Sequence, residues 1–250
     1  NLNAVRKAQR IITVSDTART EMLATLRLPP DRVVAIHNGV DFSATEASSA
    51  ALDWEPPNGD APYVLFGGSF EPRKNLMRLI EAFDLAAHRG LIHDLVMIVD
   101  SGSGHAHRVM NRARRLPCAD RLHFLSGLDE PALRAVYREA TIFAFPTLSE
   151  GFGLPPLQAM ASGVPVIASD IPIMREVLGE AAYYIDPYSP SDIADALMAL
   201  GSDGPLCERL ATAGRRRAAD FTWEETAKRT LDVYRSAVGA APPLVAAGVP

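Results

Sequence analysis

Eight short apolar runs, separated by segments with helical spacing, constrain the fold of this chain more than any other feature. Most of the runs are continuously apolar, which is typical of strands buried on both faces of a parallel sheet. Helical spacing of apolar residues follows Asn75 and again follows Asp129. Strand, loop and helix in repetition predict an α/β fold with a doubly wound, Rossmann-like parallel sheet and C-terminal helices. The runs lie at residues 10–15, 32–37, 63–68, 95–100, 122–127, 141–146, 164–169 and 182–186.

The composition limits the kinds of partner that this chain is expected to bind. With 48% hydrophobic and 22% charged residues among 250, the chain can bury a sizeable core. Its net charge of −5 gives no global field to attract nucleic acid, so no nucleic-acid partner is expected. No apolar run reaches the roughly 18 residues of a membrane span, and the N-terminus lacks the order of a signal peptide, which favours the cytoplasm. Cys118 and Cys207 follow no metal-ligand spacing and favour free thiols.

The loop at 67–75 suits a phosphate group. Ligands of doubly wound sheets bind outside the carboxyl ends of the strands, where this loop is expected to lie. Gly67 and Gly68 allow close approach of a ligand, and Arg73 and Lys74 stand just before a helix N-terminus, which also favours an anion. Lys74 is one of three lysines in the chain. A solvated basic pair is the alternative interpretation.

The loop at 100–107 carries weaker signals. Gly102 and Gly104 form a GxG pattern that serves many turns. His105 and His107 are better explained as exposed polar groups than as metal ligands. No metal site is therefore predicted.

The loop at 147–153 brings an acid, glycines and a helix start together. Glu150 leads into Gly151, Phe152 and Gly153, and the two glycines permit backbone angles that turn N–H groups toward a ligand. A helix is expected to begin at the prolines that follow, so that its dipole converges on the same point. As an alternative, Glu150 only caps this helix, although a cap does not need the glycines.

The stretch EGFGLPPLQAMASGVPVIA at 150–168 resembles the signature of the retaining glycosyltransferases of family four, group 1, which have the GT-B fold. Further matches are HNGVD at 37–41, EPRKNLMRLIEAF at 71–83 and FTWEETAKRTLDVY at 221–234. The combination is far more specific than any one of these motifs.

The resemblance implies the C-terminal, donor-binding domain of a GT-B enzyme. Residues 1–42 would be the end of an N-terminal acceptor domain with its linker, 43–222 the Rossmann-like domain that binds a nucleotide sugar, and 223–250 a closing helix and tail. The remainder of the N-terminal domain is expected in cis or on a partner chain.

The resemblance also implies roles for individual residues. Lys74 would hold the diphosphate with Arg73 beside it, and Glu150 would contact hydroxyls of the donor sugar. These three are the candidate catalytic residues. No cofactor is implied, and the family is usually metal-independent. Contacts to the base, sugar or phosphates are implied for Gly68, Ser69, Ser126, Gly127, Gly151, Phe152, Gly153, Leu154 and Gln158.

Two positions depart from the family pattern. Gln158 stands where the second acid of a Glu-x7-Glu pair binds the ribose hydroxyls. Its amide oxygen can accept a hydroxyl hydrogen bond, but without charge assistance. Ser69 stands where arginine is frequent, so Arg73 is expected to supply part of the phosphate contact.

Two functions stay open. The chain is either the donor-binding part of a retaining hexosyltransferase that acts on a glycan or lipid-linked acceptor, or a non-catalytic nucleotide-sugar binding module that needs a partner domain. A GT-B epimerase is disfavoured because the signature belongs to transferases. The EPRKNL loop resembles that of bacterial mannosyl- and rhamnosyltransferases of polysaccharide assembly, so GDP-mannose is the first expected donor. The basic run at 215–217 is either a peripheral contact to lipid headgroups at the inner face of the membrane or a solvated face.

Overall fold

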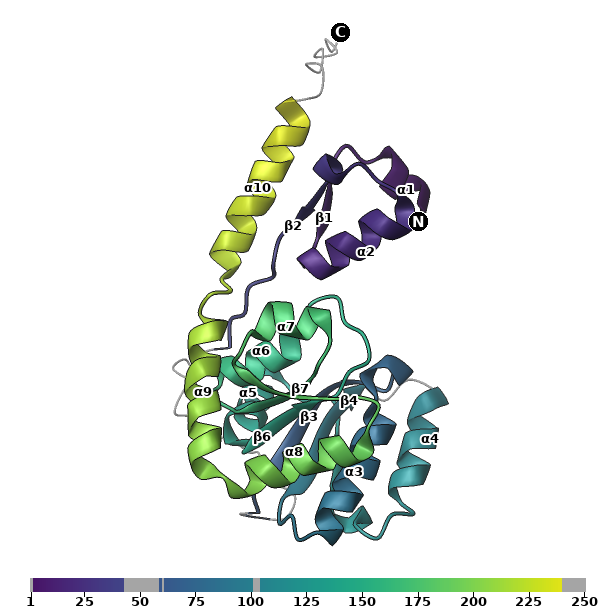
Figure 1. Cartoon of the computed structure of the whole chain (residues 1–250), viewed down its shortest axis with the longest axis vertical. Coiled ribbons are helices and arrows are strands. Elements are labelled where there is room, and N and C mark those ends of the chain that lie inside the picture. Colours follow the sequence, from purple (N-terminus) through teal and green to yellow (C-terminus); the bar gives the residue numbers. More distant parts are fainter. Residues whose placement is uncertain (1, 43–58, 60, 101–103, 240–250) are drawn as a thin grey trace. The chain divides into compact units, whose positions relative to one another are not determined.

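The computed structural model of the chain describes residues 2–42, 59, 61–100 and 104–239 (Figure 1). They group into two compact units, one formed by Asn1–Gly39 with Phe221–Pro250 and the other by Val40–Asp220. Residues 43–58, at the start of the predicted donor-binding domain, and residues 240–250 of the predicted tail lie outside the described residues.

The larger unit is built on a six-stranded parallel sheet with the strand order β5-β4-β3-β6-β7-β8. The strands form at the predicted apolar runs because most residues in them are buried, including Phe66, Phe143 and Phe145. The prediction of a doubly wound α/β fold is confirmed. The strands are β3 (Tyr63–Ser69), β4 (Asp94–Asp100), β5 (Leu122–Leu125), β6 (Ile142–Phe145), β7 (Val166–Ser169) and β8 (Ala182–Ile185).

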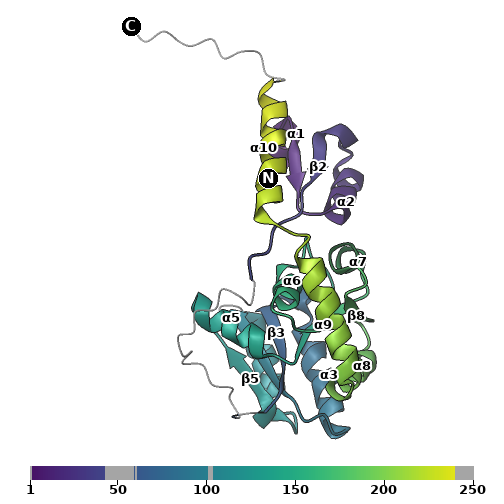
Figure 2. The same cartoon turned by 90° about the vertical axis from the view of Figure 1, so that its left-hand side faces the viewer.

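Helices cover both faces of this sheet. Helix α3 packs beside α4 and α8, and α6 packs beside α5 and α9. Figures 1 and 2 show α3 and α8 on the opposite face of the sheet from α5. The helices of this unit are α3 (Leu76–His88), α4 (Gly104–Ala113), α5 (Glu130–Glu139), α6 (Leu154–Ala161), α7 (Pro172–Leu178), α8 (Pro190–Ser202) and α9 (Gly204–Ala218).

The strand order creates a topological switch point between β3 and β6. From β3 the chain continues outward through β4 to β5, and then returns to the other side of β3 with β6. Connections on the two sides of such a point run to opposite faces, which leaves a crevice beyond the carboxyl ends of the two strands. The loops after β3 and β6 border that crevice, and they carry Lys74 and Glu150.

The smaller unit holds a two-stranded parallel sheet and the closing helix. Strand β1 pairs with β2 from Ile11 opposite Val33 to Thr13 opposite Ala35. Helix α10 is attached to the end of β2, where the Arg229 guanidinium donates to the Ala35 carbonyl at 2.8 Å. The elements are α1 (Leu2–Lys7), β1 (Ile11–Thr13), α2 (Asp16–Leu26), β2 (Val33–Ala35) and α10 (Trp223–Gly239).

Gly67 of β3 is required by the core rather than by a ligand. A Cβ added at this position would lie 2.5 Å from the hydroxyl oxygen of Tyr137, which is buried on α5. We expect Gly67→Ala to destabilise the chain by about 1–3 kcal/mol, the usual cost of overpacking. In a Tyr137→Phe background the hydroxyl is gone and the next ring atom is 3.5 Å away, so the same substitution should cost much less. Urea denaturation of the four proteins measures this, and an equal cost in both backgrounds would refute the steric explanation.

Candidate functional site

Lys74 reaches the crevice from a short turn after β3. The 3₁₀ turn η3 (Pro72–Lys74) follows the strand, and Lys74 is buried although it is charged. Its ammonium lies 5.1 Å from the centre of the Phe145 ring, a cation–π contact at the end of β6. Gly68 lines the stem of this lysine, because a Cβ there would lie 3.7 Å from the Lys74 Cδ and 3.1 Å from the Phe66 ring. The ammonium of this buried side chain therefore lies at the ends of β3 and β6.

Glu150, from the loop after β6, forms an ion pair with Lys74. The Lys74 Nζ donates to the Glu150 Oε1, and the two side chains are only 9% and 10% exposed. The Arg73 Nη1 lies 3.1 Å from the same carboxylate oxygen, and the Arg73 Nε donates to Glu71 at 2.6 Å. Partial burial alone would lower the pKa of Arg73, but the charges of Glu150 and Glu71 outweigh it and raise the pKa. One carboxylate thus lies between two cations.

The start of α6 faces the same crevice without a side-chain cap. Gly153 is the N-cap residue at φ +103°, and no side chain accepts from the first amides. The alternative in which Glu150 caps this helix is therefore wrong. Pro155 and Pro156 follow Leu154 and carry no N–H, so of the amides at this helix start those of Gly153 and Leu154 remain to donate to an anion. Phe152 is buried just before this turn, and Leu154 begins the helix half-buried.

The other residues implied by the resemblance lie at the end of β3, on α6 and after β5. Ser69 ends β3, where its hydroxyl oxygen accepts from the Glu71 amide at 3.4 Å. Gln158 is half-buried on α6, four residues after the helix begins. Ser126 and Gly127 are exposed and follow β5, the edge strand two positions from β3.

Three polar residues that the sequence analysis did not assign to the site connect its loops. Thr147 is fully buried, and its hydroxyl donates to the Arg73 carbonyl at 3.0 Å. The buried Ser169 hydroxyl donates to the Thr147 carbonyl at 2.6 Å. Asn75, which the sequence marks only as a helix start, makes side-chain contacts to two other loops. Single buried Ser, Thr and Asn residues carry no periodic signal, so the sequence could not reveal these links.

Two weaker predictions are changed by the structure. Gly104 begins helix α4 instead of lying in a loop, and Gly102 lies outside the described residues. In the basic run, Arg215 and Arg216 are exposed, but Arg217 is not a free surface charge. Its guanidinium donates to the carbonyls of Val177 and Glu176 at 2.8 Å each, which satisfies the C-terminal end of α7.

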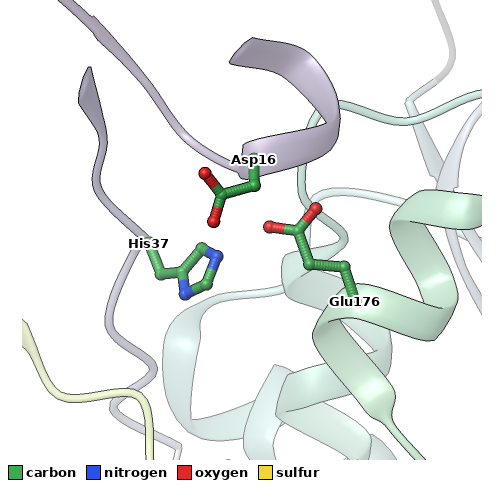
Figure 3. Close-up of side chains that lie close together, drawn as sticks. All are labelled: Asp16, His37 and Glu176. Atoms are coloured by element: carbon green, nitrogen blue, oxygen red, sulfur yellow. The ribbon is translucent and has the colours of Figure 1, made fainter. Parts of the chain in front are cut away.

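Among the residues that the structure describes, no cluster of metal-ligating side chains lies at the crevice. Within the smaller unit, Asp16 and His37 face one another (Figure 3), and Glu176, the third residue drawn there, belongs to the larger unit. Two side chains from one unit are fewer than a zinc site uses. That the protein needs no metal stays a prediction.

The cysteines and the helices agree with the expectations from composition. Both Cys118 and Cys207 are free thiols, and burial raises the pKa of Cys118 to about 12, with a further contribution from Asp84. None of the helices in the described parts of the chain is long and apolar enough to cross a membrane.

Comparison with known proteins agrees with this geometry. Curated relatives include the phosphatidyl-myo-inositol mannosyltransferase of Mycobacterium tuberculosis, at 34% identity over 91% of this chain and 60% of the relative. The O-antigen chain mannosyltransferase B of Escherichia coli is 27% identical over 91% of this chain and 61% of its own length. The chain thus spans about three-fifths of the length of these relatives.

Solved structures and family models agree on the same fold. Sucrose-phosphate synthase from Thermosynechococcus elongatus superposes with a TM-score of 0.80 at 24% identity, over 96% of this chain and 61% of that one. This likeness confirms the expected GT-B type of fold. A model of Glycosyltransferase Family 4 matches residues 2–44, and a model described as glycosyl transferases group 1 matches residues 52–217. Because the second match covers more than half of the chain, this protein belongs to the group 1 glycosyl transferases.

Proposed function

We propose that this chain holds the donor site of a retaining glycosyltransferase that moves a hexose from a nucleotide-diphosphate sugar to a glycan or lipid-linked acceptor. The observation that carries the proposal is the meeting of Lys74, Arg73 and Glu150 at the switch point of the sheet, beside the start of α6. Doubly wound sheets bind their ligands at this place. Membership of the family supports the same reaction class.

The arrangement suits the departure of a nucleoside diphosphate. In glycosyl transfer the bond from the anomeric carbon to the diphosphate breaks, and its electron pair passes to the leaving phosphate oxygen. The acceptor hydroxyl oxygen forms the new bond to the anomeric carbon, and its proton passes to the leaving diphosphate. Lys74, Arg73 and the N–H groups of Gly153 and Leu154 can stabilise the charge that gathers on the diphosphate. Glu150, held by both cations, would accept hydrogen bonds from sugar hydroxyls at the same centre.

Mannose is the proposed sugar and GDP the first proposed nucleotide. Both of the curated relatives described above are named mannosyltransferases. The whole protein's acceptor, and any peripheral contact with the membrane, belong to the same proposal. The chain spans three-fifths of those relatives, so acceptor binding would need the N-terminal domain in cis or on a partner chain.

The second function, a non-catalytic binding module, is favoured by one observation. Gln158 replaces an acid on the half-buried face of α6, and without that charge the hydrogen bond to a ribose would be weaker. Both functions require nucleotide binding at the same centre. Release of free sugar from a bound nucleotide sugar over hours would favour the transferase, since a pure binding module gives none.

A thermal-shift titration with GDP, UDP, ADP and dTDP tests the proposal. A nucleotide present at 100 times its dissociation constant adds about 2.7 kcal/mol of stability, which is readily measured. We expect GDP to stabilise the chain and the other three to act more weakly. Inorganic diphosphate serves as the control for binding to the cations alone. No stabilisation by any of the four nucleotides would remove the donor site from this chain.

A further inference from the structure

Asn75 lies directly after Lys74 and connects three loops at the carboxyl edge of the sheet. Its Nδ2 donates to the carbonyl of Pro146, after β6, at 2.9 Å and to the carbonyl of Pro187, after β8, at 2.7 Å. The Asn75 Oδ1 accepts from the Arg78 guanidinium at 2.9 Å. The loops after β3, β6 and β8 are therefore held by one side chain that is only 4% exposed.

The orientation of this amide follows from its partners. Both groups near Nδ2 are carbonyl oxygens, and the group near Oδ1 is a guanidinium, which can only donate. Both amide protons and one lone pair of the oxygen are used. An aspartate at this position would present an oxygen to the two carbonyls and lose both hydrogen bonds.

The backbone of Asn75 is equally specific. It adopts φ +62° and ψ +26°, the left-handed region in which asparagine is tolerated better than most residues. This conformation ends η3 after Lys74 and starts α3, without a side-chain cap to that helix. The sequence position of an Asn before a helix suggests a cap, but its side chain serves the neighbouring loops instead.

A second set of hydrogen bonds joins the same two loops on the other side of Lys74. The Arg73 carbonyl accepts from the Leu148 amide at 2.7 Å and from the Thr147 hydroxyl at 3.0 Å. The backbone of Lys74 thus lies between two attachments to the loop that carries Glu150. Movement of either attachment would change the separation of the ammonium and the carboxylate.

We propose that Asn75 is a positioning residue that fixes Lys74 relative to Glu150, acting through its hydrogen bonds to Pro146 and Pro187. This inference rests on the proposed donor site for its consequence in binding. At metal sites, removing a residue that orients a metal ligand lowers the affinity for the metal by about 10-fold to 100-fold. Asn75 would orient Lys74 in the same indirect way, so we expect its loss to lower the affinity for GDP by about 10-fold.

The test compares Asn75→Gly with Asn75→Ala, Thr147→Val and Tyr63→Phe in the full chain. Glycine keeps the left-handed backbone and removes the side chain, whereas alanine also strains the backbone. Thr147→Val removes the hydroxyl that donates to the Arg73 carbonyl and that also contacts the Ser149 carbonyl at 3.1 Å and the Glu150 carboxylate at 3.5 Å, which gives a second variant if Asn75 variants fold poorly. Tyr63→Phe is the matched control, because it removes a buried hydrogen bond of 2.7 Å to the Val136 carbonyl at the other end of β3.

Two measurements give separate answers. Calorimetric titration with GDP should show about 10-fold weaker binding for Asn75→Gly and unchanged binding for Tyr63→Phe. Amide hydrogen exchange at Leu148 can be measured without a nucleotide. In Asn75→Gly the exchange should be faster than the loss of global stability explains, whereas in Tyr63→Phe it should change only as much as global stability does. If wild type does not bind GDP, the proposed function fails while the exchange still tests the positioning. Equal GDP affinity and equal Leu148 exchange in the Asn75→Gly and Tyr63→Phe variants would overturn the inference.

Discussion

Replacing Lys74 by methionine is expected to destabilise the chain by about 3 kcal/mol and to abolish its stabilisation by nucleotides. The substitution keeps most of the buried stem but leaves the Glu150 carboxylate without the ammonium that pairs with it. Breaking a buried ion pair costs about 3–5 kcal/mol, and the lower end applies because Arg73 remains 3.1 Å from the carboxylate. Loss of nucleotide binding follows from the proposed role of Lys74 at the diphosphate.

The control for this prediction is Glu150→Gln, alone and combined with Lys74→Met. The double variant has no uncompensated charge, so it should be more stable than the sum of the single effects predicts. Glu150→Gln alone should retain stabilisation by GDP, because its proposed partner is the sugar and Lys74 is no longer shared with a carboxylate. Urea denaturation and thermal shift of the four proteins measure both effects. Strictly additive stabilities would show that the ion pair contributes nothing to folding.

Gly153→Ala is expected to destabilise the chain by about 2–4 kcal/mol, since two separate costs meet at this residue. Its φ of +103° is strained for any residue with a side chain, and an added Cβ would lie 2.7 Å from the Met174 Cε on α7. Met174 is fully buried, so the contact is relieved by a shift of its side chain or of the turn before α6. The strained backbone at Gly153 also displaces the N–H groups of Gly153 and Leu154, so stabilisation by GDP should be weakened.

Two matched variants separate the costs at Gly153. Gly90 has a similar φ of +98° with nothing within 4 Å of an added Cβ, so Gly90→Ala measures the backbone cost alone. In a Met174→Ala background Gly153→Ala meets no clash, so its cost relative to Met174→Ala alone is the backbone cost. We expect Gly90→Ala to cost about 1–2 kcal/mol and to leave the GDP effect unchanged. A cost at Gly153 no larger than at Gly90 would refute the contact with Met174.

The sequence alone predicted the secondary structure well because its signals are local. Each of the eight apolar runs forms a strand, and the helices after Asn75 and Asp129 begin where their apolar spacing starts. Continuous apolar runs and 3.6-residue spacing are properties of neighbouring residues, so they can be read without knowing the fold. The same holds for the motif at 150–168, which led to the family and to Glu150, and for the lysine of the loop after β3.

The tertiary structure decided how these residues meet. Lys74 and Glu150 were expected to bind different parts of one ligand, but the order of strands places β3 beside β6 and pairs the two side chains directly. Gly67 was expected to face a ligand, and the packing of Tyr137 explains it instead. The links of Asn75 to Pro146 and Pro187 join positions 71 and 112 residues away along the chain. Contacts over such separations depend on strand order and on the packing of each loop, and no local pattern encodes either of them.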